Sequence, residues 1–254
     1  MSAGRLSIVG LGPGPAQWIT PEATAALDSA SDIIGYGPYV ERLTLRADQR
    51  RHCSDNRVEI ERARQALALA ADGATVAVVS GGDPGVFAMA AAVFEAIESG
   101  ELAWRSLAVD VVPGVSAMQA AAARLGAPLG HDFCAISLSD NLKPWDIIAR
   151  RLKAAADGDF VIALYNPASK ARPGRIHDAF ALLRIHKAAS TPVAFARAVG
   201  RAEERLLLAT LADADPGAAD MSTLVLIGSS ETRFIARGDA RPWLLTPRSY
   251  GQPR

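Results

Sequence analysis

Short runs that are apolar at nearly every position recur along this chain, and amphipathic, alanine-rich stretches separate them. A strand that helices cover on both faces has no polar side, so such runs are typical of the parallel sheets of α/β proteins. In the first half we expect strands near Leu6–Gly10, Asp32–Tyr36, Thr75–Ser80 and Leu107–Val112, and helices near Thr20–Leu27, Val58–Ala71 and Val86–Ile97. Thr20 and Pro21 form an expected helix start, and Asp72-Gly73 forms an expected helix end.

The second half repeats this alternation, but two of its strands are too close in sequence for a helical crossover. Strands are expected at Phe133–Leu138, Phe160–Tyr165, Val193–Ala198, Arg205–Ala209 and Thr223–Gly228, and helices at Lys143–Ala156 and Arg175–His186. Val199–Glu204 must therefore be a hairpin turn, which makes this sheet mixed. The tail after Arg237 is rich in proline and arginine, and we expect it to be loosely held.

A domain boundary is expected near Gly126. A helix from Ser116 to about Leu125 ends there, and Pro128–Gly130 follows. This predicts two α/β domains, residues 1–125 and 126–254, each with a mostly parallel or mixed sheet flanked by helices. The length of 254 residues is compatible with two modest domains.

Composition argues against several classes of protein. Lys+Arg and Asp+Glu both number 27, so the net charge is zero and no chain-wide positive field favours nucleic acid. No apolar run approaches the roughly 18 residues of a membrane span, and the N-terminus lacks the apolar core of a signal peptide. Cys53 and Cys134 are far apart and the four histidines show no metal-ligand spacing. We therefore expect a reduced, cytoplasmic protein without a disulfide framework or a structural metal.

Three glycine-rich segments follow expected strands, at Gly10–Pro15, Ser80–Gly85 and Pro113–Ala117. A dinucleotide fingerprint fails in the first, because Pro15 occupies the third glycine position and no helix begins at the turn. The carboxyl ends of parallel strands meet at one sheet edge, where open α/β sheets bind ligands. Because glycine lets a ligand approach the backbone closely, the three loops together predict a ligand site.

These loops and the late strand Met221–Gly228 resemble the tetrapyrrole methylase superfamily over nearly the whole chain. Two further segments, Ile33–Tyr39 and Leu164–Pro173, are similar to its ring-contracting precorrin-3B branch, which acts in cobalamin biosynthesis. The resemblance implies the class III methyltransferase fold, a homodimer, and S-adenosylmethionine with the active site in the cleft between two α/β domains. It also implies methylation of carbon 17 and extrusion of carbon 20 as an acetyl group, which gives precorrin-4.

The same resemblance implies where the ligands bind. The expected cofactor-binding residues are Pro13, Gly81, Gly82, Asp83, Val86, Phe87, Ser116, Ala117, Tyr165, Asn166, Arg197, Ala198, Met221, Ser222 and Thr223. The expected substrate-binding residues are Tyr36, Tyr39, Arg50, Arg51, Lys170 and Arg172.

The two arginines Arg50 and Arg51 belong to the densest basic stretch of this neutral chain, which runs from Arg42 to His52. Arginine is suited to pairing with the carboxylates that a tetrapyrrole carries. A loop over the macrocycle would use these charges to anchor substrate, whereas a solvent-facing helix end would have no specific role.

Ring contraction requires an acid–base group in addition to the groups that methyl transfer needs. Displacement at a sulfonium needs alignment and a water-poor pocket, whereas contraction needs a proton to leave a hydroxyl group. The expected acid–base candidates are polar residues at or just after the end of the strand Phe133–Leu138, namely Ser137, Ser139, Asp140 and Lys143. His52 and His131 are further candidates.

Several alternatives stay open. Another corrinoid methylase, including one that acts on cobalt-factor III, a uroporphyrinogen methylase, and a diphthamide or RNA methylase would keep the fold. The zero net charge argues against RNA. A non-catalytic nucleotide-sensing module would use the same loops, but no attached effector domain is evident in the sequence.

Overall fold

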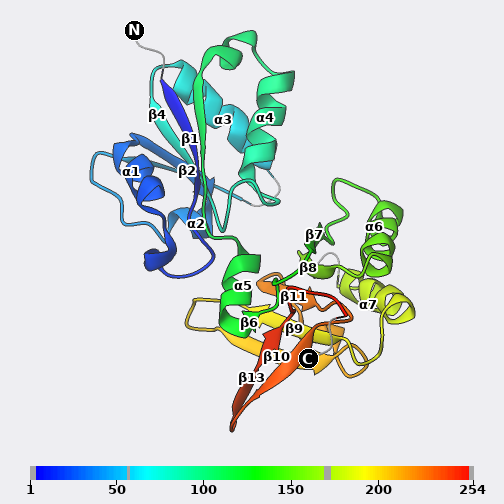
Figure 1. The fold of residues 1–254 in the computed structure, drawn as a ribbon. Coiled ribbons are helices and arrows are strands. Elements are labelled where there is room, and N and C mark those ends of the chain that lie inside the picture. The colour runs from blue at the N-terminus through cyan, green and yellow to red at the C-terminus, as the bar shows by residue number, and fades with distance from the viewer. Residues whose placement is uncertain (1–3, 56–57, 169–172, 252–254) are drawn as a thin grey trace. The chain divides into compact units, whose positions relative to one another are not determined.

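A computed structural model describes residues 4–55, 58–168 and 173–251. The chain divides into two compact units, Met1–Ala117 (unit 1) and Met118–Arg254 (unit 2). Each unit has its own sheet and helices (Figure 1). The expected boundary lay at the C-terminal end of helix α5 (Ala117–Leu125), whereas the units divide at the N-terminal end of that helix.

Unit 1 is built on a parallel sheet of five strands in the order β3-β2-β4-β1-β5. The strands are β1 (Arg5–Gly10), β2 (Asp32–Tyr36), β3 (Arg50–Ser54), β4 (Thr75–Ser80) and β5 (Ala108–Val112). The central strands β1 and β4 are buried at nearly every position. Their continuous apolar sequence therefore reflects cover on both faces, as expected.

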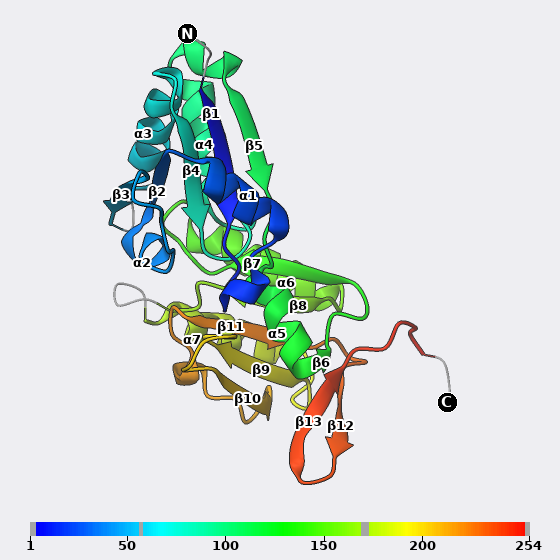
Figure 2. The same cartoon turned by 90° about the vertical axis from the view of Figure 1, so that its left-hand side faces the viewer.

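Helices cover both faces of this sheet (Figures 1 and 2). On one face lie α3 (Glu59–Ala71), α4 (Met89–Ser99) and the short η2 (Leu102–Ser106), and on the other lie α1 (Pro21–Ser29) and α2 (Gly37–Val40), which η1 (Ala16–Trp18) precedes. The Thr20 hydroxyl accepts a hydrogen bond from the Ala23 N–H at 3.1 Å, which confirms the expected cap of α1. Gly73, with φ of 95°, follows the end of α3 as predicted.

Two expectations about unit 1 were wrong. Part of the basic stretch, expected as a loop or a helix end, forms the edge strand β3 along β2. Helix α4 begins at Met89 rather than Val86, because Phe87 takes a left-handed backbone with φ of 53° that no α-helix can contain.

Unit 2 has a mixed sheet of five strands in the order β10-β9-β11-β8-β7. The strands are β7 (Phe133–Ser137), β8 (Val161–Tyr165), β9 (Pro192–Arg197), β10 (Arg205–Thr210) and β11 (Thr223–Ile227). Strands β7 and β8 are parallel and the other neighbours are antiparallel, so the expected β9–β10 hairpin is confirmed.

Helices α6 (Trp145–Asp157) and α7 (Arg175–His186) pack on one face of this sheet, and η3 (Pro216–Ala218) precedes β11. The core between helices and strands includes Phe180 of α7 stacked on Phe195 of β9, with ring centroids 5.9 Å apart. No helix within the described ranges is long and apolar enough to cross a membrane.

The tail after Arg237 was expected to be loosely held, and this was wrong for its first part. Strands β12 (Arg233–Arg237) and β13 (Ala240–Leu245) form a hairpin, and β13 also pairs with β6 (Gly126–Ala127). The hairpin is visible in unit 2 in Figure 2. The Thr246 hydroxyl donates to the Pro128 carbonyl at 2.6 Å and is buried, so the chain is fixed beyond the hairpin.

Candidate functional site

The three glycine-rich loops of unit 1 come together at the carboxyl edge of its sheet. The Leu11 N–H donates to the Ser80 carbonyl at 2.9 Å, and the Gly12 N–H donates to the Gly82 carbonyl at 3.1 Å. A Cβ on Gly114 would lie 2.5 Å from the Gly82 carbonyl oxygen. The prediction that these strand exits converge is therefore confirmed for the backbone.

The glycines at this edge have different physical roles. At Gly10, Gly81 and Gly114 a Cβ would collide with a neighbouring loop or, for Gly81, with the ring of Tyr39 at 2.7 Å. These three glycines allow close packing. Gly82 differs, because it has φ of 79° and its Cβ would meet nothing nearer than the Ala117 nitrogen and the Val115 oxygen, both at 3.9 Å. Of these four glycines, Gly82 is the one at which a Cβ would meet backbone groups of unit 1 without a clash.

Asp83 fixes the geometry of two of these loops. One carboxylate oxygen accepts the Gly85 N–H at 2.8 Å, and the other accepts the Gly114 N–H at 3.0 Å. The turn continues with Val86, whose N–H donates to the Asp83 carbonyl at 3.3 Å, and with Phe87, whose side chain is half exposed. Pro13 lies in the first loop, and Ser116 and Ala117 close the third.

In unit 2, Ser137 and Tyr165 lie opposite each other at the ends of β7 and β8. The Asn166 amide donates to the Ser137 hydroxyl at 3.0 Å, and the Tyr165 hydroxyl accepts the Met118 N–H at 3.1 Å. The structure thus brings three of the predicted residues together, with Ser137 buried.

A second group at the same edge of this sheet joins the end of β9 to the start of β11. Arg197 lies opposite Thr223, and the Ala198 N–H donates to the Ser222 carbonyl at 2.9 Å. Asp220 was missed in the sequence, yet it accepts from Arg197 at 2.7 Å, from the Thr223 hydroxyl at 2.7 Å and from the Ser222 N–H at 2.9 Å. Met221, which lies between Asp220 and Ser222 in the chain, is exposed. The sequence signal that could have identified Asp220 is its position directly before Met221-Ser222-Thr223.

Left-handed backbone is concentrated in the segments expected to bind cofactor. Four non-glycine residues of the described chain have positive φ, and three of them are Phe87 (53°), Asn166 (52°) and Ala198 (48°). This conformation costs about 1–2 kcal/mol per residue and persists where the surroundings fix it, as at ligand-binding segments.

The three acid–base candidates differ in their surroundings. Asp140 accepts from the Arg175 guanidinium at 2.6 Å, and Ser137 is engaged by Asn166. Burial, and then the nearby charge of Arg151, lower the pKa of Lys143. A lysine with a lowered pKa is more readily available as a base than an ordinary lysine.

Arg50 was expected to bind substrate, but it already has a partner within unit 1. It donates to the buried carboxylate of Asp32 at 2.8 Å, and His52 contacts the other oxygen at 2.7 Å. Burial raises the pKa of Asp32, but hydrogen bonds from Arg50, His52 and Ser31 outweigh it and lower that pKa to about 2. This cluster fastens β3 to β2.

The other expected substrate residues are less constrained. Arg51 donates to the Leu43 carbonyl at 3.3 Å. Tyr36 and Tyr39 meet edge to face with centroids 5.4 Å apart, beside Gly81. Lys170 and Arg172 lie outside the described residues.

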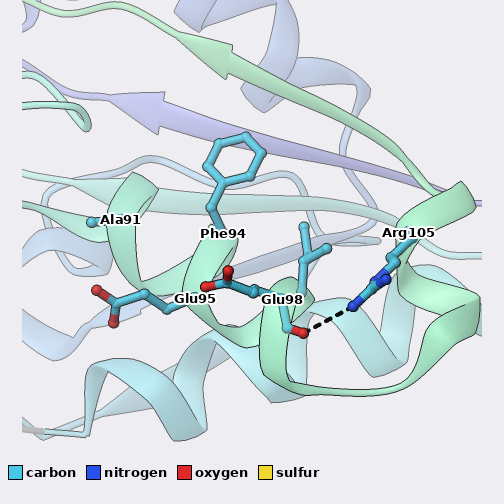
Figure 3. Close-up of a pocket in the computed structure, with 6 residues that line it drawn as sticks. Ala91, Phe94, Glu95, Glu98 and Arg105 are labelled. Carbon is cyan, nitrogen blue, oxygen red and sulfur yellow. Dashed lines mark hydrogen bonds between the residues drawn. The ribbon is translucent and has the colours of Figure 1, made fainter.

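Unit 1 also carries a hollow of about 580 Å³ away from these loops (Figure 3). It is lined by Ala91, Phe94, Glu95, Ile97, Glu98 and Arg105. None of the expected site residues lines it, and in the parts of the chain that the structure describes no three His, Cys, Asp or Glu side chains gather in a way that could hold a metal ion.

A parallel α/β unit with convergent glycine-rich strand exits, followed by a mixed α/β unit, defines a class III methyltransferase. The model of the Tetrapyrrole (Corrin/Porphyrin) Methylases matches residues 5–215, and the chain belongs to this family. Members of the family use S-adenosylmethionine as methyl donor, and this chain is a methyltransferase of that kind.

Individual relatives are similar over nearly the whole of this chain. The chain is 57% identical over 247 residues to a Sinorhizobium protein named precorrin-3B C(17)-methyltransferase, covering 97% of each chain. It is 41% identical to a probable cobalt-factor III C(17)-methyltransferase of Salmonella typhimurium, covering 96% of this chain and 99% of that protein. It is 47% identical to the Mycobacterium tuberculosis protein CobIJ, of which it spans 48%.

Solved structures share the fold. The methyltransferase CobJ superimposes with a TM-score of 0.91 at 50% identity, covering 96% of this chain and all of that one. A uroporphyrin-III C-methyltransferase of Thermus thermophilus, solved with S-adenosylhomocysteine, has a TM-score of 0.68 at 23% identity and covers 89% of this chain.

The residues of unit 1 fit the methyl donor. Backbone groups border Gly82, because a Cβ there would lie 3.9 Å from the Ala117 nitrogen and from the Val115 oxygen. An adenosine and an amino-acid group both need backbone donors and acceptors, which such a border supplies.

Proposed function

We propose that this protein transfers the methyl group of S-adenosylmethionine to carbon 17 of precorrin-3B and contracts the macrocycle, so that carbon 20 leaves the ring as an acetyl group. The observation that carries the proposal is the 57% identity with the Sinorhizobium precorrin-3B C(17)-methyltransferase over 97% of both chains. A full-length match at this level supports a common reaction as well as a common fold.

Residues of unit 1 hold the methyl donor in this proposal. Bound S-adenosylmethionine supplies an electrophilic methyl group on a sulfonium. The loop around Gly82 gives it bare backbone to lie against, and Asp83 keeps that loop fixed against Gly114. Fixed loops suit this chemistry, because displacement at a sulfonium depends on alignment and on exclusion of water.

We assign removal of the substrate hydroxyl proton to Lys143. Burial lowers its pKa, so a larger fraction is neutral than for an exposed lysine. Asp140 is held by Arg175 instead, and the pKa of that guanidinium is raised by its hydrogen bonds to Asp140 and Asp178. Ser137 holds Asn166 in its left-handed conformation through the amide hydrogen bond.

Incubation of the purified protein with S-adenosylmethionine and precorrin-3B tests the proposal. We expect a product heavier by one methyl group, and carbon-13 NMR should show carbon 20 as an acetyl carbonyl. A methylated product that retains carbon 20 in the ring would show a methylase without contraction. Absence of any methyl transfer would contradict the proposal.

Cobalt-factor III is the second candidate substrate, because the Salmonella typhimurium and Priestia megaterium relatives with that name are 41% and 39% identical. The identity to the precorrin-3B relative is higher, so we expect the metal-free substrate to give the larger kcat/KM. Parallel assays with the two macrocycles decide between them.

We also propose a homodimer. Phe94 of α4, Leu102 of η2 and Val111 of β5 are 50%, 77% and 41% exposed, and the last two residues follow α4 in the chain. Exposed apolar side chains on one unit are typical of a surface that a second copy covers. Analytical ultracentrifugation should show a dimer that Phe94→Glu weakens, and a wild-type monomer would contradict this.

We place the protein in the cytoplasm. Cys53 and Cys134 are both free thiols, which a reducing compartment preserves. Recovery of the protein in a membrane or periplasmic fraction would contradict this.

A further inference from the structure

Arg62 of α3 is a buried cation whose contacts are all neutral. Only 4% of the surface of Arg62 is exposed to solvent. The guanidinium donates to the Ser54 hydroxyl at 2.8 Å, to the Asp55 carbonyl at 2.6 Å and to the Met89 sulfur at 3.3 Å. A thioether is a weak hydrogen-bond acceptor, so the guanidinium nitrogen that faces Met89 has no strong acceptor.

No counter-charge accompanies this guanidinium. Among the described residues, no carboxylate lies within ion-pair distance of Arg62, although nine other pairs between Lys or Arg and a carboxylate are formed. The remaining residues, 1–3, 56–57, 169–172 and 252–254, include no Asp or Glu. Burial lowers the pKa of Arg62, which the nearby Glu59 and Tyr39 only partly offset.

A buried charge without an opposite charge is costly, and folded proteins normally pair it. An anion that reaches Arg62 would therefore gain a strong, desolvated contact. Arginine presents its donors as a planar fork, which matches the two oxygens of a carboxylate.

The position of Arg62 places it with the expected substrate residues. Ser54 ends β3, and Met89 begins α4 directly after the cofactor loop. Tyr39, which acts electrostatically on Arg62, packs against Gly81 and meets Tyr36 edge to face. The guanidinium thus belongs to the carboxyl edge of the unit 1 sheet, where β2, β3 and β4 end.

We propose that Arg62 is the anchor of a carboxylate-binding site in unit 1, which takes an acetate or propionate side chain of the tetrapyrrole. The identity of the ligand rests on the proposed function. The site replaces the role first expected of Arg50, whose guanidinium already binds Asp32.

The test compares Arg62→Met with the wild type and with Arg64→Met, a control on the same helix whose residue is exposed. We expect Arg62→Met to raise the KM for precorrin-3B by about ten- to a hundredfold, as loss of a charge-assisted contact does. The Kd for S-adenosylhomocysteine should stay within about twofold. Arg64→Met should match the wild type.

Thermal stability separates this role from a purely structural tie. If Arg62 only ties β3 to α4, its removal should lower the Tm with or without ligand. If Arg62 binds an anion only when the ligand is present, Arg62→Met should keep or raise the Tm of the ligand-free protein, because an unpaired buried charge is removed. Citrate, a simple carboxylate probe, should raise the Tm of the wild type and of Arg64→Met, but not that of Arg62→Met.

The outcomes distinguish this site from the proposed function. A wild type that responds to citrate through Arg62 but fails to methylate precorrin-3B would contradict the function and leave the carboxylate site standing. A wild type that turns over precorrin-3B, with the same KM and citrate response in Arg62→Met, would overturn the site. If Arg62→Met does not fold, Arg62→Lys replaces it. That variant keeps the charge without the fork, so wild-type KM and citrate response in Arg62→Lys would also overturn the site.

Discussion

The carboxylate of Asp83 accepts the backbone N–H of Gly114 at 3.0 Å, although the two residues are 31 positions apart in the chain. Its other oxygen accepts the Gly85 N–H at 2.8 Å. One side chain therefore sets both the shape of the loop after β4 and its distance from the loop after β5. The close approach of the two loops also needs glycine at position 114, because a Cβ there would lie 2.5 Å from the Gly82 carbonyl oxygen.

Replacing Asp83 by alanine should loosen both loops. Each lost hydrogen bond to a charged acceptor is worth about 1.5–3 kcal/mol when it is shielded from water, and less where, as here, water can replace it. We expect Asp83→Ala to weaken S-adenosylmethionine binding by about tenfold in calorimetry. Asp72→Ala, at the exposed end of α3, is the control. Equal affinities in the two variants would show that the carboxylate does not shape the cofactor site.

Replacing Gly82 should impair binding more than it impairs folding. Alanine at φ of 79° costs about 1–2 kcal/mol of backbone strain, and it places a methyl group beside the Ala117 nitrogen and the Val115 oxygen, where the cofactor is proposed to lie. We expect a loss of S-adenosylmethionine affinity larger than that of Asp83→Ala. Gly238→Ala is a matched control, since Gly238 has φ of 49° and nothing within 4 Å. Both variants should lose a similar amount of Tm, and an unchanged Kd in Gly82→Ala would remove this loop from the site.

The buried Asp32 should make unit 1 sensitive to acid. Its folded pKa of about 2 lies below the ordinary 3.8, so its contribution to stability is fully present above pH 3.8 and is lost as the pH falls towards 2. Asp32→Asn should lower the free energy of unfolding by about 1.5–3 kcal/mol at neutral pH. Urea melts from pH 7 to pH 2 should show this gap closing between about pH 4 and pH 2. Asp28→Asn, at an exposed position on α1, is the control. A gap that stays constant down to pH 2 would contradict the assignment.

Lys143 should control the contraction step. A general base must be neutral, so the single-turnover rate of contraction should rise with pH up to the pKa of Lys143, which burial sets below 10.5. Lys143→Met should slow contraction by about a hundredfold or more and abolish this rise, because the proton acceptor is lost. Lys153→Met, an exposed lysine of α6, should behave like the wild type. If Asp140→Asn rather than Lys143→Met gives a methylated, uncontracted product, the base is Asp140.

The elements that the sequence predicted well are those with local signals. The bounds of β4 (Thr75–Ser80) and α7 (Arg175–His186) agree with the expected ranges. A run of buried β-branched residues or an apolar stripe at helical spacing carries such information within the segment itself.

The elements that the sequence missed depend on distant contacts. The polar sequence of β3 gives no strand pattern, and the segment becomes a strand because Arg50 and His52 reach Asp32. Likewise, β13 needs β12 and the short β6 beside it. Tertiary pairing of this kind overrides local propensity.

The candidate site was predictable in part. Motif residues named the loops, and those loops converge as expected. The left-handed conformations of Phe87 and Ala198 could not be anticipated, because that region is disfavoured for residues with a Cβ. The buried state of Arg62 could not be seen either, since the helix pattern shows which face is covered but not what a long side chain meets there.

The parallel pairing of unit 1 has a consequence for synthesis of the chain. Strand β1 (Arg5–Gly10) pairs with β4 and β5 but not with β2, so β1 has no partner in its sheet until Thr75–Ser80 has been made. Its apolar edges remain open during that interval, and non-local pairing of this kind is slow and prone to aggregation. The β9–β10 hairpin of unit 2, with only a short turn between its strands, needs no such delay. A nascent chain stalled before β4 should therefore depend on chaperones, and one stalled after β5 should not.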